Sequence, residues 1–116
     1  SRAPTTFAKF AKPKMQSLPA LKWIPLGAGK KAPPSRPDGN PFDVVFINRT
    51  RHPVKLFWMD RQGSTKPYTL IAPGKFKYQQ TRPGAVWMIA DAQEKNGKPL
   101  GYFVVGDRAA RAVVPK

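Results

Sequence analysis

The sequence predicts an all-β fold, namely a small seven-stranded antiparallel β-sandwich that follows an extended Pro/Lys-rich N-terminal arm. Two observations lead to this prediction. From Phe42 onward, short apolar runs alternate with turn residues at intervals of about 10 residues and show no helical periodicity. Before Phe42, frequent prolines remove amide donors and disfavour both long helices and paired strands. We therefore expect an arm over residues 1–41 and a sandwich over residues 42–116.

The predicted arm is both basic and apolar. It contains 8 of the 14 prolines, and it carries 8 Lys and Arg against one acid. The stretch TTFAKFAK at 5–12 predicts a short helix with both phenylalanines on one face, and LPALKWIPLG at 18–27 is too apolar for a solvated linker. Such a segment alone cannot offset about 1–2 kcal/mol of backbone entropy per residue. We therefore expect its own domain, a neighbouring molecule or a partner to hold it.

The arm supplies the residues that are predicted to fasten the protein to a larger assembly. The expected apolar anchors are Phe7, Phe10, Leu21, Trp23, Ile24 and Leu26. The expected basic contacts are Lys9, Lys12, Lys14, Lys22, Lys30, Lys31 and Arg36. Because the sandwich is expected to fold unaided, deletion of residues 1–41 is predicted to release a folded sandwich from its partner.

The predicted strands are short apolar runs separated by turn sequences such as RQG, APG and RPG. These runs are DVVFIN (43–48), VKLFWMD (54–60), YTLI (68–71), KFKYQQT (75–81), VWMIAD (86–91), GYFVV (101–105) and AVV (112–114). In the second run, Val54, Leu56 and Trp58 share one face, whereas Phe57 and Met59 lie on the other. These two outward apolar side chains need cover, which a docked arm would supply. In the KFKYQQT run, the two aromatic residues face away from the lysines.

Charge predicts an acidic partner. The 116 residues have room for one domain and carry 21 Lys and Arg against 6 Asp and Glu, for a net charge of +15. Another protein's acidic face, an anionic lipid surface and nucleic acid all fit this charge. No apolar run approaches the roughly 20 residues needed to cross a bilayer, so no transmembrane segment is expected. The chain begins at Ser1 rather than Met, which favours an exported, periplasmic protein peripheral to a membrane complex.

The sequence offers little catalytic chemistry, and we predict that the protein is not an enzyme and needs no cofactor or metal. There are no cysteines, and the carboxylates lie in predicted loops or at predicted strand ends, where turn and capping roles are ordinary. His52 is the only histidine and precedes a proline in a predicted turn, and such a histidine is more often solvated than catalytic. The APGK at 72–75 lacks the earlier glycine and the following Ser or Thr of a phosphate-binding loop.

Three stretches, NRTRHPVKLFW, GSTKPYTLIAPG and TRPGAVWMIAD, resemble in order and spacing the β domain of the von Hippel-Lindau tumour suppressor, including bacterial proteins of that type. The resemblance covers roughly residues 43–115. The matching positions are Asn48, Arg49, Trp58, Gly63, Tyr68, Pro73, Gly74, Thr81, Trp87 and Asp91. The resemblance implies a seven-stranded sandwich that receives a peptide without catalysis, with a hydroxyproline held between aromatics, a serine hydroxyl and a histidine.

Carried over by position, the resemblance implies a peptide groove made by Trp58, Tyr68, Thr81 and Trp87. Thr81 stands where the family has its serine hydroxyl. Ala85 stands where the family has its histidine, so the imidazole donor to a buried hydroxyl is lost at a cost of about 1–3 kcal/mol. The three aromatics also suit a sandwich core. The tumour suppressor continues into a helical domain that engages elongin and a ubiquitin ligase, whereas this sequence stops at Lys116, so a role as a ligase substrate receptor does not follow from the resemblance.

These observations predict a non-catalytic protein-interaction or scaffolding module. Its expected role is that of an accessory subunit, anchored by the arm to a larger complex such as a membrane-bound photosynthetic or respiratory assembly. One alternative is a nucleic-acid-associated basic protein like those of the ribosome, whose binding would fall steeply with salt. The other is a free receptor for proline-rich peptides.

Overall fold

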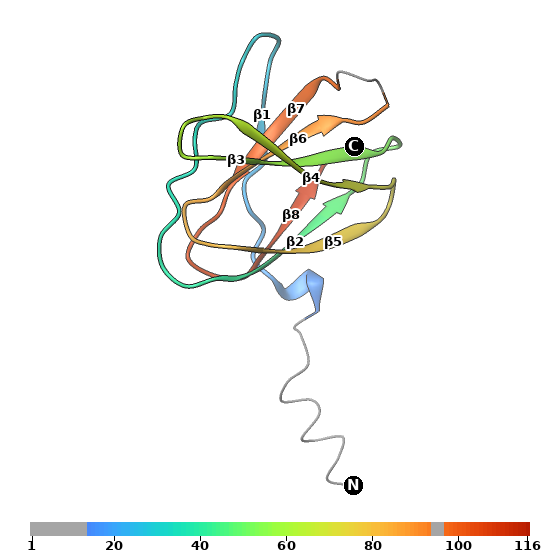
Figure 1. Cartoon of the computed structure of the whole chain (residues 1–116). Coiled ribbons are helices and arrows are strands. Elements are labelled where there is room, and N and C mark those ends of the chain that lie inside the picture. Colours follow the sequence, from blue (N-terminus) through green and yellow to red (C-terminus); the bar gives the residue numbers. More distant parts are fainter. Residues whose placement is uncertain (1–13, 94–96) are drawn as a thin grey trace, which may run out of the picture.

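The computed structural model describes residues 14–93 and 97–116, and it confirms the predicted all-β sandwich (Figure 1). The elements are a 3-10 helix η1 (Met15–Ser17) and the strands β1 (Ile24–Pro25), β2 (Phe42–Asn48), β3 (Val54–Met59), β4 (Thr65–Ile71), β5 (Phe76–Thr81), β6 (Val86–Asp91), β7 (Pro99–Val104) and β8 (Ala110–Val114). A five-stranded sheet in the order β1-β7-β6-β3-β4 faces a three-stranded sheet in the order β5-β2-β8. No helix in these residues is long and apolar enough to cross a membrane.

All seven predicted strands are present as β2 to β8, but the described residues form eight strands, and β8 pairs in parallel with β2. The additional strand, β1, comes from the predicted arm and pairs with β7 through Ile24 and Pro25. Pro25 has no amide donor, which limits further pairing at this point. β8 runs parallel to β2, whereas an antiparallel arrangement was predicted throughout. This pair can be parallel because β3 to β7 form a long crossover between the two strands.

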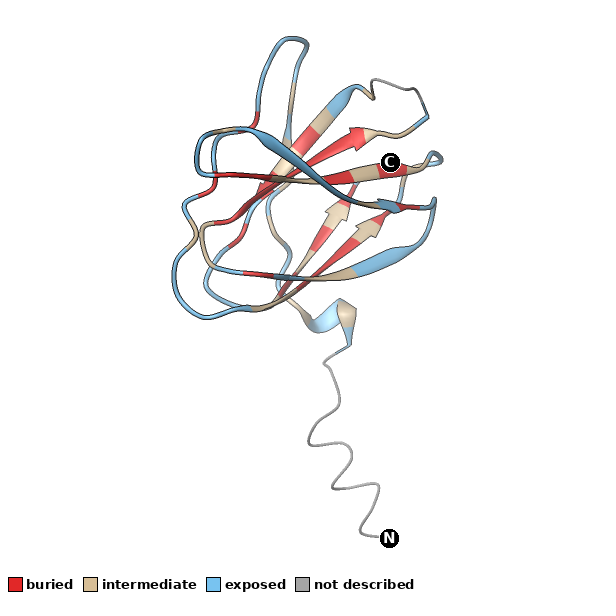
Figure 2. Cartoon of the chain, viewed as in Figure 1, coloured by how far each residue is buried: buried red, intermediate tan, exposed pale blue. Residues whose placement is uncertain are grey.

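The main core lies between the two sheets, where aromatic rings pack edge to face. Phe46 of the small sheet meets Trp87 and Phe103 of the large sheet, with ring centroids 5.7 and 6.1 Å apart. Trp23 of the predicted arm extends this cluster, since its ring lies 5.2 Å from that of Phe103. Figure 2 shows buried residues on β2, β3, β6 and β8, while β4 is largely exposed. Trp23 therefore packs on the sandwich core.

The predicted arm also covers the outer face of the large sheet. Met59, together with Val86, Met88 and Ala90, forms a second apolar cluster against which Leu26 and Phe57 pack. This arrangement confirms that the outward side chains of β3 need cover and that the arm provides it. From the arm, Ala32 is buried in the same cluster. The arm was expected to be held by its own domain, by a neighbouring molecule or by a partner. In the described residues it packs on its own domain.

Two glycines permit the close approach of the arm. A Cβ atom at Gly101 of β7 would collide with the ring of Trp23 and with the carbonyl of Ile24. A Cβ atom at Gly84 would collide with the carbonyl of Arg36, and Gly84 also has φ = 83°, which favours glycine. The amide of Arg36 donates to the carbonyl of Gly84 at 2.9 Å. Gly84 and Gly101 therefore leave room for the backbone and the tryptophan of the arm, a role that the pattern of hydrophobic residues does not reveal.

Ser35 joins the arm to β6 by a buried polar contact. Its hydroxyl accepts a hydrogen bond from the amide of Val86 at 2.6 Å and lies 3.4 Å from the carbonyl of the same residue. Ser35 is almost wholly buried, so this hydroxyl satisfies backbone groups that water does not reach. The predicted helix at 5–12 lies outside the described residues, as do Phe7, Phe10, Lys9 and Lys12.

Candidate functional site

The four residues predicted to form a peptide groove, Trp58, Tyr68, Thr81 and Trp87, lie together at one end of the sandwich. They come from the end of β3, the middle of β4, the end of β5 and the start of β6. They line a hollow of about 210 Å³. The remaining residues of its wall are Pro37, Gln80, Arg82 and Ala85.

Trp87 forms the floor of the groove and is also part of the main core. It is 2% exposed and belongs to the core cluster, while Trp58 opposite it on β3 is half-buried against the same cluster. Tyr68 stands edge-on to Trp87, with ring centroids 4.9 Å apart and planes at 88°. Because Tyr68 is 52% exposed, it forms a wall that a ligand can reach. Core packing and a groove therefore coexist at these aromatics.

A β-bulge places Tyr68 over the groove. Leu56 pairs with Thr69 and Phe57 pairs with Pro67, so Tyr68 is the extra residue between two registers. A bulge re-aims a side chain and breaks the ladder locally, and proline is common at such points of edge strands. β4 is an edge strand of the large sheet, which gives the bulge room. The sequence signal for this feature is the proline immediately before Tyr68.

Thr81 supplies a buried hydroxyl beside the aromatic floor. The indole Nε1 of Trp87 donates a hydrogen bond to Thr81 Oγ1 at 2.9 Å, and Thr81 is 7% exposed. In the part of the chain that the structure describes, the Thr81 hydroxyl donates to no acceptor, so its proton is available to a ligand. Ala85 presents only a methyl group at the position that the resemblance gives to histidine. The groove is therefore mainly apolar, with one hydroxyl at its floor.

The predicted arm forms one side of the groove through Pro37. The guanidinium of Arg61 donates to the carbonyl of Pro37 at 2.9 Å, and the amide of Asp38 donates to the carbonyl of Pro83 at 2.9 Å. Arg82 crosses to the same segment, where its Nη1 donates to the carbonyl of Gly39 at 2.6 Å. Sequence reasoning missed Pro37 and Arg82, because no local pattern indicates which loops meet at the end of a sandwich.

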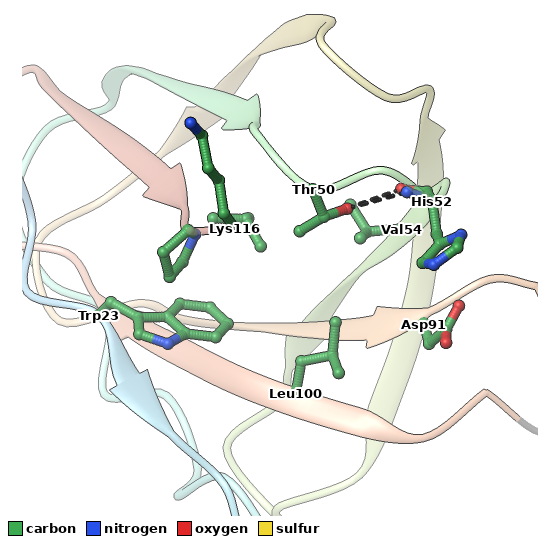
Figure 3. Close-up of a pocket in the computed structure, with 9 residues that line it drawn as sticks. Trp23, Thr50, His52, Val54, Asp91, Leu100 and Lys116 are labelled. Carbon is green, nitrogen blue, oxygen red and sulfur yellow. Dashed lines mark hydrogen bonds between the residues drawn. The ribbon is translucent and has the colours of Figure 1, made fainter.

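A second hollow of about 300 Å³ lies at the opposite end of β3 (Figure 3). Trp23, Val54 and Leu100 are among the apolar residues that line it, and His52 and Asp91 lie on one side of it. Lys116 is also part of its lining. The hydroxyl of Thr50 donates a hydrogen bond to the carbonyl of His52 at 2.8 Å, which fixes the loop between β2 and β3. The hollow suits an apolar group, and no local sequence pattern indicates it.

The structure places the other predicted contact residues as follows. Leu21 and Trp23 pack against the main core, Leu26 packs against the second cluster, and Ile24 lies in β1. These three packed side chains are engaged within the chain. The exposed basic side chains of the arm are Lys14, Lys22, Lys30, Lys31 and Arg36. Their contacts with a partner stay a prediction.

Comparison with known families gives a match over more than half of the chain. Residues 35–101 match the sequence model of a family described as the VHL beta domain. The matched segment contains every residue that lines the aromatic groove. It begins at Ser35, the serine that joins the predicted arm to β6.

Proposed function

Because the chain belongs to the VHL beta domain family, whose members are non-enzymatic protein-interaction domains, we propose that it is a non-catalytic module that binds an extended peptide in its aromatic groove. The family supports a protein partner. The groove of Trp58, Tyr68, Thr81 and Trp87 supports an extended peptide with one apolar side chain seated between the rings. The half-exposed Tyr68 over the buried Trp87 is the observation that carries this proposal.

The edge strand beside the groove provides the backbone contacts for such a peptide. β4 ends the order of the large sheet, and most of its residues are exposed. An extended peptide that pairs with a free strand edge gains main-chain hydrogen bonds, while pockets beside the edge select its side chains. Tyr68 lies on this strand, so a peptide paired with β4 runs beside the Tyr68 wall of the groove.

The chemistry of the groove favours an unmodified proline or a small aliphatic side chain over hydroxyproline. Two aromatic rings and Ala85 offer apolar contacts, and Thr81 is the hydroxyl at the floor. A buried hydroxyl on the ligand needs a partner, and leaving one unpaired costs about 1–3 kcal/mol. With an alanine in the histidine position, the Thr81 hydroxyl is the one partner named here for a ligand hydroxyl, so hydroxylation gains less than in a groove that also holds a histidine.

The test is binding of a fluorescein-labelled (Ala-Pro)5 peptide to the full chain, measured by fluorescence anisotropy. Replacement of Tyr68 by alanine is expected to weaken binding by about tenfold, which corresponds to about 1.4 kcal/mol. Leu70→Ala is the matched control, because Leu70 lies on the same strand and is also exposed. Equal affinity of wild type and Tyr68→Ala would overturn the groove as the binding site. The same peptide with hydroxyproline in place of proline is measured beside it. If the hydroxyproline peptide bound more tightly than the proline peptide, the proposed ligand preference would be overturned.

The finer role that we propose is that of an accessory subunit in a larger protein complex at a membrane periphery, with the basic arm as a further contact. The exposed lysines of the arm and the net charge of +15 support an acidic partner surface. Co-purification from the native source tests this role. Retention of the same protein partners above about 0.5 M salt supports it, because electrostatic nucleic-acid binding falls steeply over that range. Recovery of RNA alone, lost at that salt concentration, would support the nucleic-acid alternative.

A further inference from the structure

We propose that Arg82 makes the aromatic groove selective for peptides that carry a carboxylate close to the seated proline. The ligand class is then an acidic, proline-containing protein segment. This inference rests on the proposed function, because it concerns the same groove. The observation behind it is a guanidinium that is fixed in the groove wall while part of its hydrogen-bonding capacity stays unused.

The fold holds Arg82 at both ends. Its backbone lies in the turn between β5 and β6, where its carbonyl accepts a hydrogen bond from the amide of Ala85 at 3.2 Å. At the other end of the side chain, Nη1 donates to the carbonyl of Gly39 at 2.6 Å. A long side chain that is already fixed loses little further rotamer freedom when a ligand binds, so less of the binding energy is spent on ordering it.

The rest of the guanidinium is free to bind a ligand. An arginine presents five N–H groups in a planar fork. Within residues 14–93 and 97–116, the Nε and Nη2 atoms of Arg82 form no hydrogen bond or ion pair. Nε and Nη2 lie on the same edge of the fork, and such an edge binds both oxygens of one carboxylate. Because Arg82 is exposed, a ligand in the groove can reach this edge.

The chain's own carboxylates near the groove leave this edge unoccupied. Asp38 lies on the arm segment that Arg82 contacts, and Asp43 pairs in register with Gln80 of the groove wall. In the part of the chain that the structure describes, Arg82 forms an ion pair with neither of them. Arg61 donates to the same arm segment and adds a second guanidinium. The selectivity therefore depends on the free edge of Arg82 rather than on a large local excess of positive charge.

The size of the groove sets where the carboxylate of the ligand must lie. Successive residues of an extended peptide are about 3.3 Å apart, so a side chain one or two positions from the seated proline reaches the wall of a hollow of about 210 Å³. Aspartate or glutamate at that position meets the free edge of Arg82. Lysine or arginine there meets a fixed positive charge, and such repulsion adds to the discrimination between peptides.

The experiment measures, by fluorescence anisotropy, the ratio of the affinities of the full chain for (Glu-Pro)5 and (Ala-Pro)5 peptides labelled with fluorescein. Physiological salt is used, because it screens exposed charges beyond about 8 Å. The wild type is expected to favour the acidic peptide by about tenfold, which corresponds to about 1.4 kcal/mol. Arg82→Gln is expected to reduce this ratio to about twofold or less.

Arg51→Gln is the matched control. It makes the same change in net charge on an exposed residue of the loop between β2 and β3, at the opposite end of the sandwich. This variant is expected to keep the tenfold ratio. An equal loss of the ratio in Arg51→Gln and Arg82→Gln would show general attraction between charges and overturn the proposal.

Two further variants test the guanidinium itself. Arg82→Lys keeps the charge but lacks the planar fork, so a ratio of about threefold is expected. Arg82→Glu is expected to reverse the preference, with (Lys-Pro)5 bound more tightly than (Glu-Pro)5. Circular dichroism shows whether each variant folds. A ratio that stays at tenfold in folded Arg82→Gln and Arg82→Glu would overturn the role of Arg82.

The failure of this inference differs from the failure of the proposed function. If the wild type bound neither peptide, or if Tyr68→Ala bound both as well as the wild type, the groove itself would be wrong. If Tyr68→Ala weakened both peptides while the wild type bound them with equal affinity, the groove would stand and the selectivity for a carboxylate would be overturned. This last comparison needs no variant of Arg82.

Discussion

Trp87 shows why residue type alone did not decide between a core and a binding site. Its ring packs on Phe46 in the core, its other side forms the groove floor, and its Nε1 is fixed by Thr81. Tryptophan combines a large apolar body with one polar atom, so a single side chain meets both demands. The resemblance identified the four groove residues. The half-exposure of Tyr68 depends on a bulge and a sheet edge, which only the three-dimensional pairing reveals.

The hydrogen bond between Thr81 and Trp87 gives a prediction at the scale of single residues. Thr81→Val keeps the shape of the side chain but leaves a buried indole N–H without its acceptor. We expect the free energy of unfolding to fall by about 1–3 kcal/mol, because an unpaired buried donor carries its full desolvation cost. Thr81→Ser keeps the hydroxyl and is expected to lose about 1 kcal/mol or less. Urea denaturation of the three proteins measures the difference, and equal stabilities of the two variants would contradict it.

The positions of the strands along the chain were easier to predict than which strands pair with each other. Alternation in residues 54–60 fixed both faces of β3, and the structure confirms that the outward face is covered. The prediction began this strand at residue 68, whereas β4 begins at Thr65. The reason is Pro67, which argues against a strand in the local pattern but is tolerated in an edge strand. Prolines also made residues 18–27 look irregular, although Ile24 and Pro25 pair with β7. Local sequence reports strand tendency, whereas strand order depends on which apolar faces meet.

The docking of β1 on β7 depends on the absence of a side chain at Gly101. Gly101→Ala would push a methyl group into the ring of Trp23. We expect the free energy of unfolding to fall by about 1–3 kcal/mol, as overpacking in a filled core does. Tryptophan fluorescence is expected to shift to longer wavelength as Trp23 moves into water. Gly106→Ala is the control, since a Cβ atom there meets nothing within 4 Å and Gly106 has no positive φ.

For the whole molecule, the division of the sequence at Phe42 marks a change in amino-acid composition. It does not mark a boundary between two parts that pack separately. The arm has 8 of the 14 prolines and the lower density of strand residues, and this contrast is real in the sequence. Yet Trp23 packs on the main core and Ala32 on the second cluster, and the family match begins at Ser35. Such contacts join residues distant in sequence, so no window of local pattern contains them. The groove likewise needs Pro37 from this segment as a wall.

Truncation is the test at this scale, and it separates two parts of the predicted arm. Removal of residues 1–37 takes away Trp23, Leu26 and the Ser35 hydroxyl, so it exposes apolar surface on both sheets and leaves the amide of Val86 without its partner. Loss of a fully buried tryptophan costs about 3–5 kcal/mol; Trp23 is partly buried, but the same truncation also removes Leu26 and the Ser35 hydroxyl, from a domain that has about 5–15 kcal/mol in total. We therefore expect a molten or unfolded product by near-ultraviolet circular dichroism, rather than the free-standing sandwich predicted from sequence. Removal of residues 1–13 alone keeps Trp23, Leu26 and Ser35, and is expected to leave the free energy of unfolding within about 0.5 kcal/mol of that of the full chain. A cooperative, equally stable fold after removal of residues 1–37 would show that the sandwich does not depend on Trp23, Leu26 and Ser35.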